Sequence, residues 1–152
     1  MRSVLRIFLA LAALGGVAAN AATARPLAGK PQYIARGDAI CARAIQQTRA
    51  LGVVPTMQAW GGAAGTRLLA IDHTALAGLK SLVPPPVDAA RLRGLLAGAS
   101  ATVAETARAL AAARAGDAAS FRAHAGRVAV LTRRYQAGAR AYGFRVCARW
   151  GS

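Results

Sequence analysis

Apolar residues recur at helical spacing along four stretches of the chain, and the alternating patterns typical of strands are almost absent. The two earlier stripes comprise Ile34, Cys41, Ile45, Thr48 and Leu51, and then Leu68, Leu69, Ile71, Ala75, Leu76, Leu79 and Leu82. The third has spacings of three and four, at Leu92, Leu96, Ala99, Val103, Thr106, Leu110 and Ala113. The fourth recurs every seven residues at Phe121, Val128, Tyr135 and Tyr142, and is widened by Ala125, Leu131, Ala139 and Val146. Each stripe predicts a helix with one buried face.

Turn-forming residues separate these stretches. Gly52 ends the first helix, and the loop over 53–62 leaves room for a little local helix. The prolines at 84–86 stop the second helix, Gly116 separates the third from the fourth, and Gly143 loosens the end of the fourth. Because short loops make neighbouring helices antiparallel, the sequence predicts an all-α, up-down-up-down four-helix bundle.

Three of the five acidic residues, Asp38, Asp88 and Asp117, fall at the predicted helix starts. The positive end of the helix dipole favours carboxylates there, so we expect these residues to be structural. Alanine and glycine occupy many positions of the apolar stripes, which leaves a thin core. A thin core needs another source of stability.

The N-terminus has the composition of a secretory signal peptide. Arg2 and Arg6 precede an apolar run over 7–19, and small residues allow cleavage after Ala21 or, as we prefer, after Ala24. The run is shorter than the ~20 residues that a membrane span needs, and no later segment avoids arginine for that long. We therefore expect a signal peptide at 1–24, a linker at 25–32 and a four-helix bundle domain at 33–152, in a protein that is soluble outside the cytoplasm.

The chain has two cysteines, Cys41 and Cys147. Cys41 lies too far beyond the apolar run to carry a lipid anchor. A redox pair is normally close in sequence, and covalent haem needs a CxxCH motif that is absent here. In a bundle with an even number of alternating helices, the start of the first helix and the end of the last lie at the same end, so the spacing predicts a structural disulfide. Closing a loop of about 100 residues would stabilise the fold by about 4–5 kcal/mol.

Several short stretches of the chain carry a resemblance to a known family: Tyr33, GDAIC at 37–41, LVPPP at 82–86, AGD at 115–117 and AYGFRVC at 141–147. Together they resemble a family of small exported or lipid-anchored helical-bundle proteins of GC-rich actinobacteria. The resemblance covers most of the mature chain and supports both the fold and the disulfide, but it implies no activity. Many relatives carry a lipoprotein cysteine, which this sequence lacks.

The chain is strongly basic, with 20 Lys and Arg against 5 Asp and Glu. Arginine-rich codon usage in a GC-rich genome is one explanation, and a partner rich in negative charge is the other. Five arginines of the fourth helix fall away from its apolar stripe: Arg122, Arg127, Arg133, Arg134 and Arg140. We expect this face to meet an anionic envelope polymer or a phospholipid surface. Nucleic acid is a poor physiological partner for an exported protein.

Catalytic groups are scarce. Asp72 and His73 are adjacent, but neighbouring residues on a helix point about 100° apart, so we expect a structural pair that nearby arginines satisfy. Glu105 and Arg108 are expected to form a surface ion pair. The sequence contains no nucleophile elbow, zinc motif, phosphate loop or dinucleotide fingerprint. These observations predict a non-catalytic binding module without a cofactor.

The alternative function is a bundle that holds haem or a transition metal. His124 lies beside the fourth apolar stripe, and in parallel helices it would share one half of the bundle with His73, with Met57 in the loop above. The competing interpretation is a core histidine bonded to a carbonyl or carboxylate. Trp60 and Trp150 are expected to pack at the loop and at the chain end.

Overall fold

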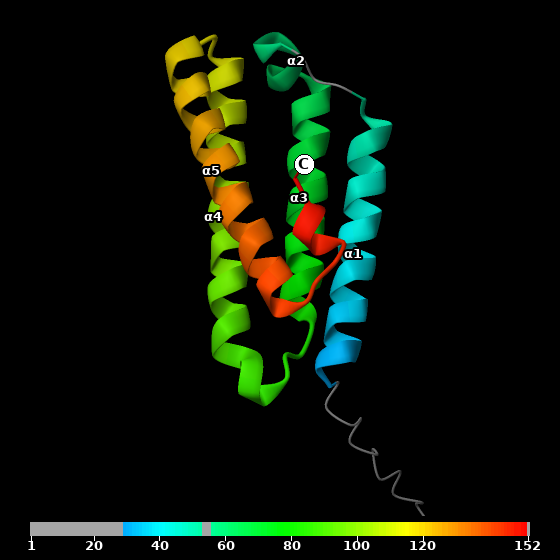
Figure 1. Cartoon of the computed structure of the whole chain (residues 1–152). Coiled ribbons are helices and arrows are strands. Elements are labelled where there is room, and N and C mark those ends of the chain that lie inside the picture. Colours follow the sequence, from blue (N-terminus) through cyan, green and yellow to red (C-terminus); the bar gives the residue numbers. More distant parts are fainter. Residues whose placement is uncertain (1–28, 53–55, 152) are drawn as a thin grey trace, which may run out of the picture.

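The protein is described by a computed structural model that covers residues 29–52 and 56–151. These residues form α1 (Lys30–Ala50), α2 (Met57–Gly61), α3 (Ala63–Ser81), η1 (Pro86–Asp88), α4 (Ala89–Arg114), α5 (Ala118–Tyr142) and η2 (Cys147–Arg149), as Figure 1 shows. No strand occurs within these two ranges, which confirms the all-α prediction. The predicted signal peptide at 1–24 lies outside them.

The structure has five α-helices where the sequence analysis expected four, because the loop over 53–62 contains α2. This helix of 5 residues is capped by Thr56, whose hydroxyl accepts a hydrogen bond of 3.1 Å from the backbone N–H of Ala59. It lies across the end of the molecule at which α3 begins (Figure 1). At the other end, α1 begins at Lys30, inside the stretch 25–32 that the sequence analysis treats as a linker, and Pro31 lies in its first turn.

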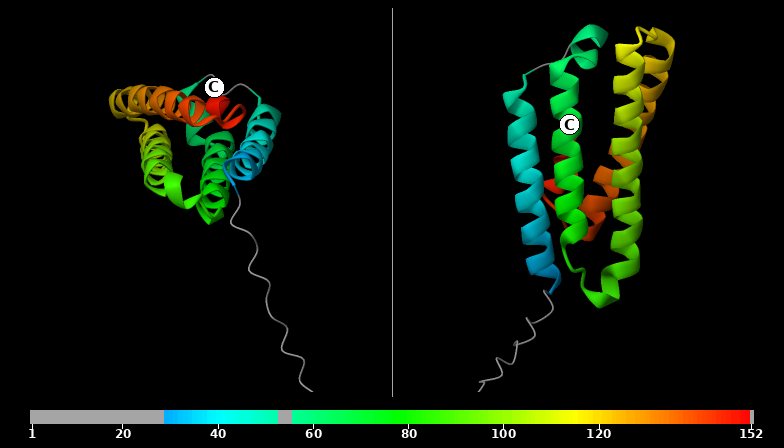
Figure 2. Two further views of the ribbon diagram at one scale, coloured as in Figure 1. Left: turned by 60° about the horizontal axis from the view of Figure 1, so that its bottom comes forward. Right: turned by 180° about the vertical axis from the view of Figure 1, so that it is seen from behind.

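The long helices pack in chain order, with α1 on α3, α3 on α4 and α4 on α5. The first and last long helices, α1 and α5, are joined by another part of the chain. Residues 144–151 turn back after α5 and lie between α5 and α1 (Figure 2). We call residues 144–151 the C-terminal segment. Its η2 helix contacts both α1 and α5, and its side chains Phe144, Cys147, Ala148 and Trp150 belong to the buried core.

Two glycines allow the C-terminal segment to reverse direction. Gly143 ends α5 in the left-handed conformation, with φ 118°, and the next backbone N–H, of Phe144, donates to the carbonyl of Ala139 at 3.0 Å. Gly37 on α1 then leaves room for the Phe144 ring, because a Cβ at this position would lie 2.6 Å from it. The sequence analysis placed Val146 on the stripe of the last helix, which is wrong because α5 ends at Tyr142.

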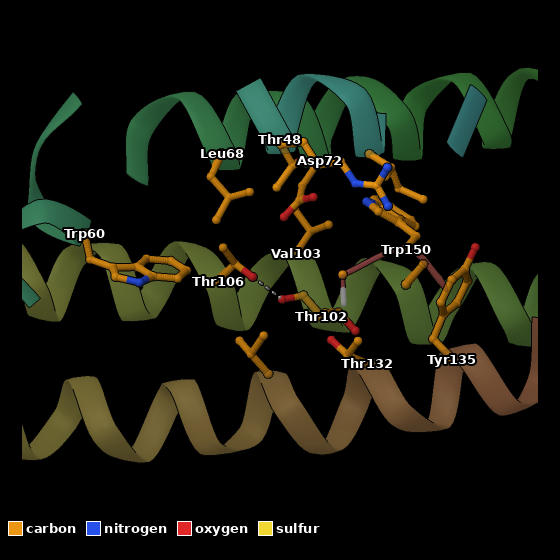
Figure 3. Close-up of a pocket in the computed structure, with 15 residues that line it drawn as sticks. Thr48, Trp60, Leu68, Asp72, Thr102, Val103, Thr106, Thr132, Tyr135 and Trp150 are labelled. Carbon is orange, nitrogen blue, oxygen red and sulfur yellow. Dashed lines mark hydrogen bonds between the residues drawn. The ribbon is translucent and has the colours of Figure 1, made fainter. Parts of the chain in front are cut away.

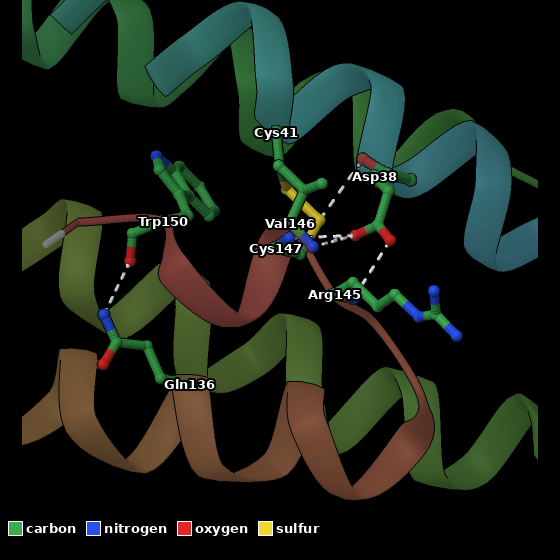
Figure 4. The surroundings of a disulfide bond; sticks show 8 residues. Asp38, Cys41, Gln136, Arg145, Val146, Cys147 and Trp150 are labelled. Atoms are coloured by element: carbon green, nitrogen blue, oxygen red, sulfur yellow. Dashed lines mark hydrogen bonds between the residues drawn. A yellow bond between two sulfur atoms is a disulfide. The ribbon is translucent and has the colours of Figure 1, made fainter. Parts of the chain in front are cut away.

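The predicted disulfide is confirmed. Cys41 and Cys147 are bonded with a Cα–Cα distance of 5.1 Å and join the middle of α1 to the C-terminal segment. Beside the bond, the carboxylate of Asp38 accepts three backbone hydrogen bonds from this segment, from Arg145 at 3.0 Å and from Val146 and Cys147 at 2.9 Å each (Figure 4). Asp38 therefore lies well inside α1 and binds another segment, so its expected place at a helix start is wrong.

The other two acids of this group lie at helix starts, as expected. Asp117 caps α5 by accepting a hydrogen bond of 2.9 Å from the N–H of Ser120. Asp88 precedes α4, but its side chain makes no capping hydrogen bond. Its carboxylate instead accepts a hydrogen bond of 2.9 Å from the hydroxyl of Tyr142. The prediction of a dipole-stabilised cap therefore holds fully only for Asp117.

We expect Asp38→Ala to lower the free energy of unfolding by about 2–4 kcal/mol with the disulfide intact. Hydrogen bonds to a charged group are worth about 1.5–3 kcal/mol each. In the variant, water can take the place of Asp38 as acceptor for the exposed backbone N–H of Arg145, which reduces the total loss. Urea unfolding under non-reducing conditions measures the effect. The control is Asp117→Ala, which removes an ordinary helix cap and should cost about 1 kcal/mol. Equal costs for the two variants would contradict the role given to Asp38.

Candidate functional site

A partly open cavity of about 290 Å³ lies between the end of the C-terminal segment and α2. Every α-helix and the C-terminal segment contribute to its wall: Ile45, Thr48, Arg49, Trp60, Leu68, Asp72, Ala99, Thr102, Val103, Thr106, Val128, Thr132, Tyr135, Trp150 and Gly151. Most of these side chains are apolar or aromatic. Four threonines, Arg49 and Asp72 add polar groups, and a cavity of this size with apolar walls and some polar groups is typical of a small-molecule site.

Aromatic residues stand at the two ends of the cavity. Trp60 comes from α2 and packs edge-on against Phe121, with ring centroids 6.0 Å apart. Trp150 comes from the C-terminal segment and packs edge-on against Tyr135, with centroids 5.5 Å apart. Figure 3 shows Trp60 at one end of the site and Trp150 and Tyr135 at the other. The two tryptophans therefore do more than pack at the loop and the chain end, as the sequence analysis expected.

Asp72 is the carboxylate of this cavity. It projects from α3 between Leu68 and Trp150, toward Val103 on α4 (Figure 3). Burial raises its pKa to about 6, and a hydrogen bond from the Trp150 indole opposes this rise. The adjacent His73 is exposed and does not share the cavity. The expected structural pair of Asp72 and His73, satisfied by arginines, is therefore wrong.

Threonines supply the other polar atoms near the middle of the cavity. Thr102 and Thr106 donate their hydroxyl hydrogens to the backbone carbonyls of Gly98 and Thr102, each at 3.1 Å. Their hydroxyl oxygens keep lone pairs that can accept a hydrogen bond. Asp72 and these threonines thus offer acceptors, while Arg49 and the Trp150 indole are donors of the wall.

The lining contains no histidine, cysteine or lysine. Its one carboxylate is that of Asp72, and its hydroxyl groups come from four threonines and Tyr135.

A second polar cluster surrounds Glu105, which is buried between α4 and α5. Its carboxylate pairs with Arg108, lies 3.0 Å from Nε of Arg127 and 2.7 Å from Nδ1 of His124. The hydrogen bonds of His124 and Arg127 lower the pKa of Glu105 to about 2. The expected surface pair of Glu105 and Arg108 is therefore part of a larger cluster, in which a buried carboxylate joins two helices and both arginines stay exposed.

His124 has the structural role that the sequence analysis set against metal binding, because its ring is bonded to the carboxylate of Glu105. The same Nδ1 lies 2.7 Å from Nη2 of Arg127. His73 is exposed on α3, and Met57 is half-buried at the start of α2. In the two described ranges, no group of three His, Cys, Asp or Glu side chains is placed to hold a metal ion.

The arginine face of α5 is exposed at Arg122, Arg133, Arg134 and Arg140, but Arg127 is engaged with Glu105 and Arg140 donates to the carbonyl of Ala148 at 3.2 Å. A groove of about 400 Å³ continues this face across α4. It is lined by Arg91, Gly94, Leu95, Gly98, Leu131, Arg134, Tyr135, Gly138 and Tyr142. Three of the lining residues are glycines, and α4 and α5 each contribute one arginine.

The sequence analysis missed the cavity, although one signal pointed toward it. Asp72 lies four residues from both Leu68 and Leu76, so helical spacing places it on the apolar stripe of its own helix. A carboxylate at such a position is unusual unless it has a partner or a function. No pattern in the sequence showed that the C-terminal segment would turn back and bring Trp150 to this carboxylate.

Comparisons with known protein families, with curated proteins and with solved structures find no significant match to this chain.

We expect Asp72→Asn to stabilise the protein above about pH 6. The folded pKa of Asp72, about 6, exceeds the ordinary value of 3.8, so ionisation costs stability as the pH rises from about 4 to 6, and the cost is complete above that range. The full shift corresponds to about 3 kcal/mol, and partial exposure reduces the expected gain to about 1–2 kcal/mol.

Chemical unfolding of both proteins near pH 7.5 and near pH 4 measures this gain, which should shrink at the lower pH. The matched control is Asp117→Asn, because hydrogen bonds from Ser120 lower the pKa of Asp117 and its replacement should destabilise at neutral pH. A loss of stability in Asp72→Asn near pH 7.5 would show that the carboxylate is satisfied in the folded protein.

Proposed function

We propose that this protein is a non-catalytic binding module of the extracytoplasmic space, which docks on anionic groups of the cell envelope. In this proposal residues 1–24 are removed as a signal peptide, and the four long helices form an up-down-up-down bundle that the disulfide closes. The partner offers phosphate or carboxylate groups, on phospholipid heads or on wall polymers. Arginine binds both groups through paired hydrogen bonds.

The observation that carries this proposal is the placement of the acidic side chains. All five acids of the chain lie within the described ranges, and each makes an internal contact or lines the cavity: Asp38, Asp72, Asp88, Glu105 and Asp117. Four of the five are buried or half-buried. The cations are thus left on the outside with few opposite charges among them, so the surface has a strongly positive potential.

The arginine face of α5 is the best candidate for the contact itself. Arg122, Arg133 and Arg134 are exposed, and Val130 between them is 40% exposed. Ala123, Gly126 and Ala129 are exposed between Arg122 and Arg133, beside Arg127, so much of this face is formed by small residues. In the part of the chain that the structure describes, no helix has the length and apolar character of a membrane span.

The test is a triple variant, Arg122→Gln, Arg133→Gln and Arg134→Gln, compared with the unchanged protein. Cosedimentation with vesicles of phosphatidylglycerol and phosphatidylcholine, and separately with cell-wall polymer, measures binding over a series of salt concentrations. Each arginine near an anionic surface contributes about 1 kcal/mol, so binding of the triple variant should fall by more than tenfold at low salt. Whichever material retains the unchanged protein identifies the source of the anionic groups.

The matched control removes three exposed arginines elsewhere, with Arg36→Gln, Arg43→Gln and Arg93→Gln on α1 and α4. It has the same net charge as the test variant and should keep most of the binding. Equal losses in the two variants would mean that net charge alone, rather than the face of α5, determines the contact. Binding of the unchanged protein that does not depend on salt would contradict the proposal.

A further inference from the structure

Asp72 is the acidic side chain that lines the cavity, and burial raises its pKa. Glu105 is paired with two arginines and a histidine, Asp38 binds three backbone N–H groups, Asp117 caps α5, and Asp88 accepts a tyrosine hydroxyl. Asp72 has one neutral donor, an indole N–H. A carboxylate that is withdrawn from water without a positive partner costs free energy.

The cation that lines the cavity does not neutralise this carboxylate. Arg49 belongs to the wall and is exposed, and the ion pairs of the described residues all involve Glu105, so none joins Arg49 to Asp72. The chain has 20 lysines and arginines, so a positive partner at this position would be readily available to the fold. No lysine or arginine of the described residues pairs with Asp72, so a positive group of a ligand can pair with this carboxylate.

The walls on both sides of Asp72 suit an organic cation with an apolar body. Trp60 and Trp150 lie toward the two ends of the cavity with Tyr135 beside the latter (Figure 3), and the faces of such rings attract cations. Leu68, Val103 and other aliphatic residues complete the wall. The hydroxyl oxygens of the threonines accept hydrogen bonds that an ammonium group can donate.

We propose that the cavity binds a small organic amine in its protonated form, with the ammonium group on Asp72 and the apolar body between Trp60 and Trp150. A volume of about 290 Å³ is at the lower end of the range of ligand sites, which limits the amine to roughly the size of a substituted bicyclic ring. The proposal does not depend on the envelope contact, because it concerns the interior and not the arginine face.

Three probes with the same ring and different head groups test the proposal: tryptamine, tryptophol and indole-3-acetate. They place an ammonium, a hydroxyl and a carboxylate on the same indole. The chain has two tryptophans and both line the cavity, so both indole N–H resonances of ¹⁵N-labelled protein should shift on titration. Calorimetry should give the affinity order tryptamine, tryptophol, indole-3-acetate, with at least a tenfold difference between the first two.

Two substitutions separate the contributions of charge and space. Asp72→Asn should lower the affinity for tryptamine by tenfold or more and leave the affinity for tryptophol nearly unchanged. The two probes should then bind the variant with similar affinity. Val128→Phe fills the cavity and should abolish binding of every probe. Val130→Phe is its matched control, because Val130 lies on the exposed side of the same helix and outside the cavity, and it should bind tryptamine as the unchanged protein does.

Three results would overturn the proposal: no shift of either indole resonance with any probe, tryptophol binding as tightly as tryptamine, or tryptamine binding unaffected by Asp72→Asn. The triple arginine variant on α5 should bind tryptamine normally. Loss of vesicle binding with intact tryptamine binding, or the reverse, therefore distinguishes a failure of the envelope proposal from a failure of this one.

Discussion

Asp38 holds the end of the chain in place, and the other features of the structure depend on that contact. Its carboxylate accepts three consecutive backbone N–H groups of the C-terminal segment, next to the disulfide between Cys41 and Cys147. The disulfide limits how far the segment can move, and the hydrogen bonds fix its direction. Without this direction α1 and α5 would have no common neighbour, because each packs on η2.

The position of the C-terminal segment also creates the cavity. The segment fills part of the space between α1 and α5, and Trp150 with Gly151 at its end forms part of the cavity wall. Thin apolar stripes, rich in alanine, leave the remaining space unfilled. The apolar stripe of α3 also places Asp72 beside that space. Its ionised carboxylate lowers the stability of the fold there and puts a negative charge in the cavity wall. A destabilising carboxylate in a cavity is a feature that function explains better than packing does.

The distribution of charge has the same origin. Because the acids are used for internal contacts and most arginines lie outside, the chain presents a positive exterior, while Asp72 places a carboxylate in the cavity. The two proposed partners, an anionic surface and a small cation, are therefore assigned to different parts of the same molecule. The two contacts do not compete, since neither uses the residues of the other.

The sequence alone determined the four long helices and the disulfide that joins the first of them to the end of the chain. Heptad spacing, prolines at 84–86 and the cap at Asp117 define where helices lie, because these are local effects of backbone geometry and side-chain periodicity. The spacing of Cys41 and Cys147 predicted their bond. Only the tertiary structure decided the partners of Asp38 and Glu105 and the surroundings of Asp72, because these contacts join residues on different elements and leave no periodic trace in the sequence.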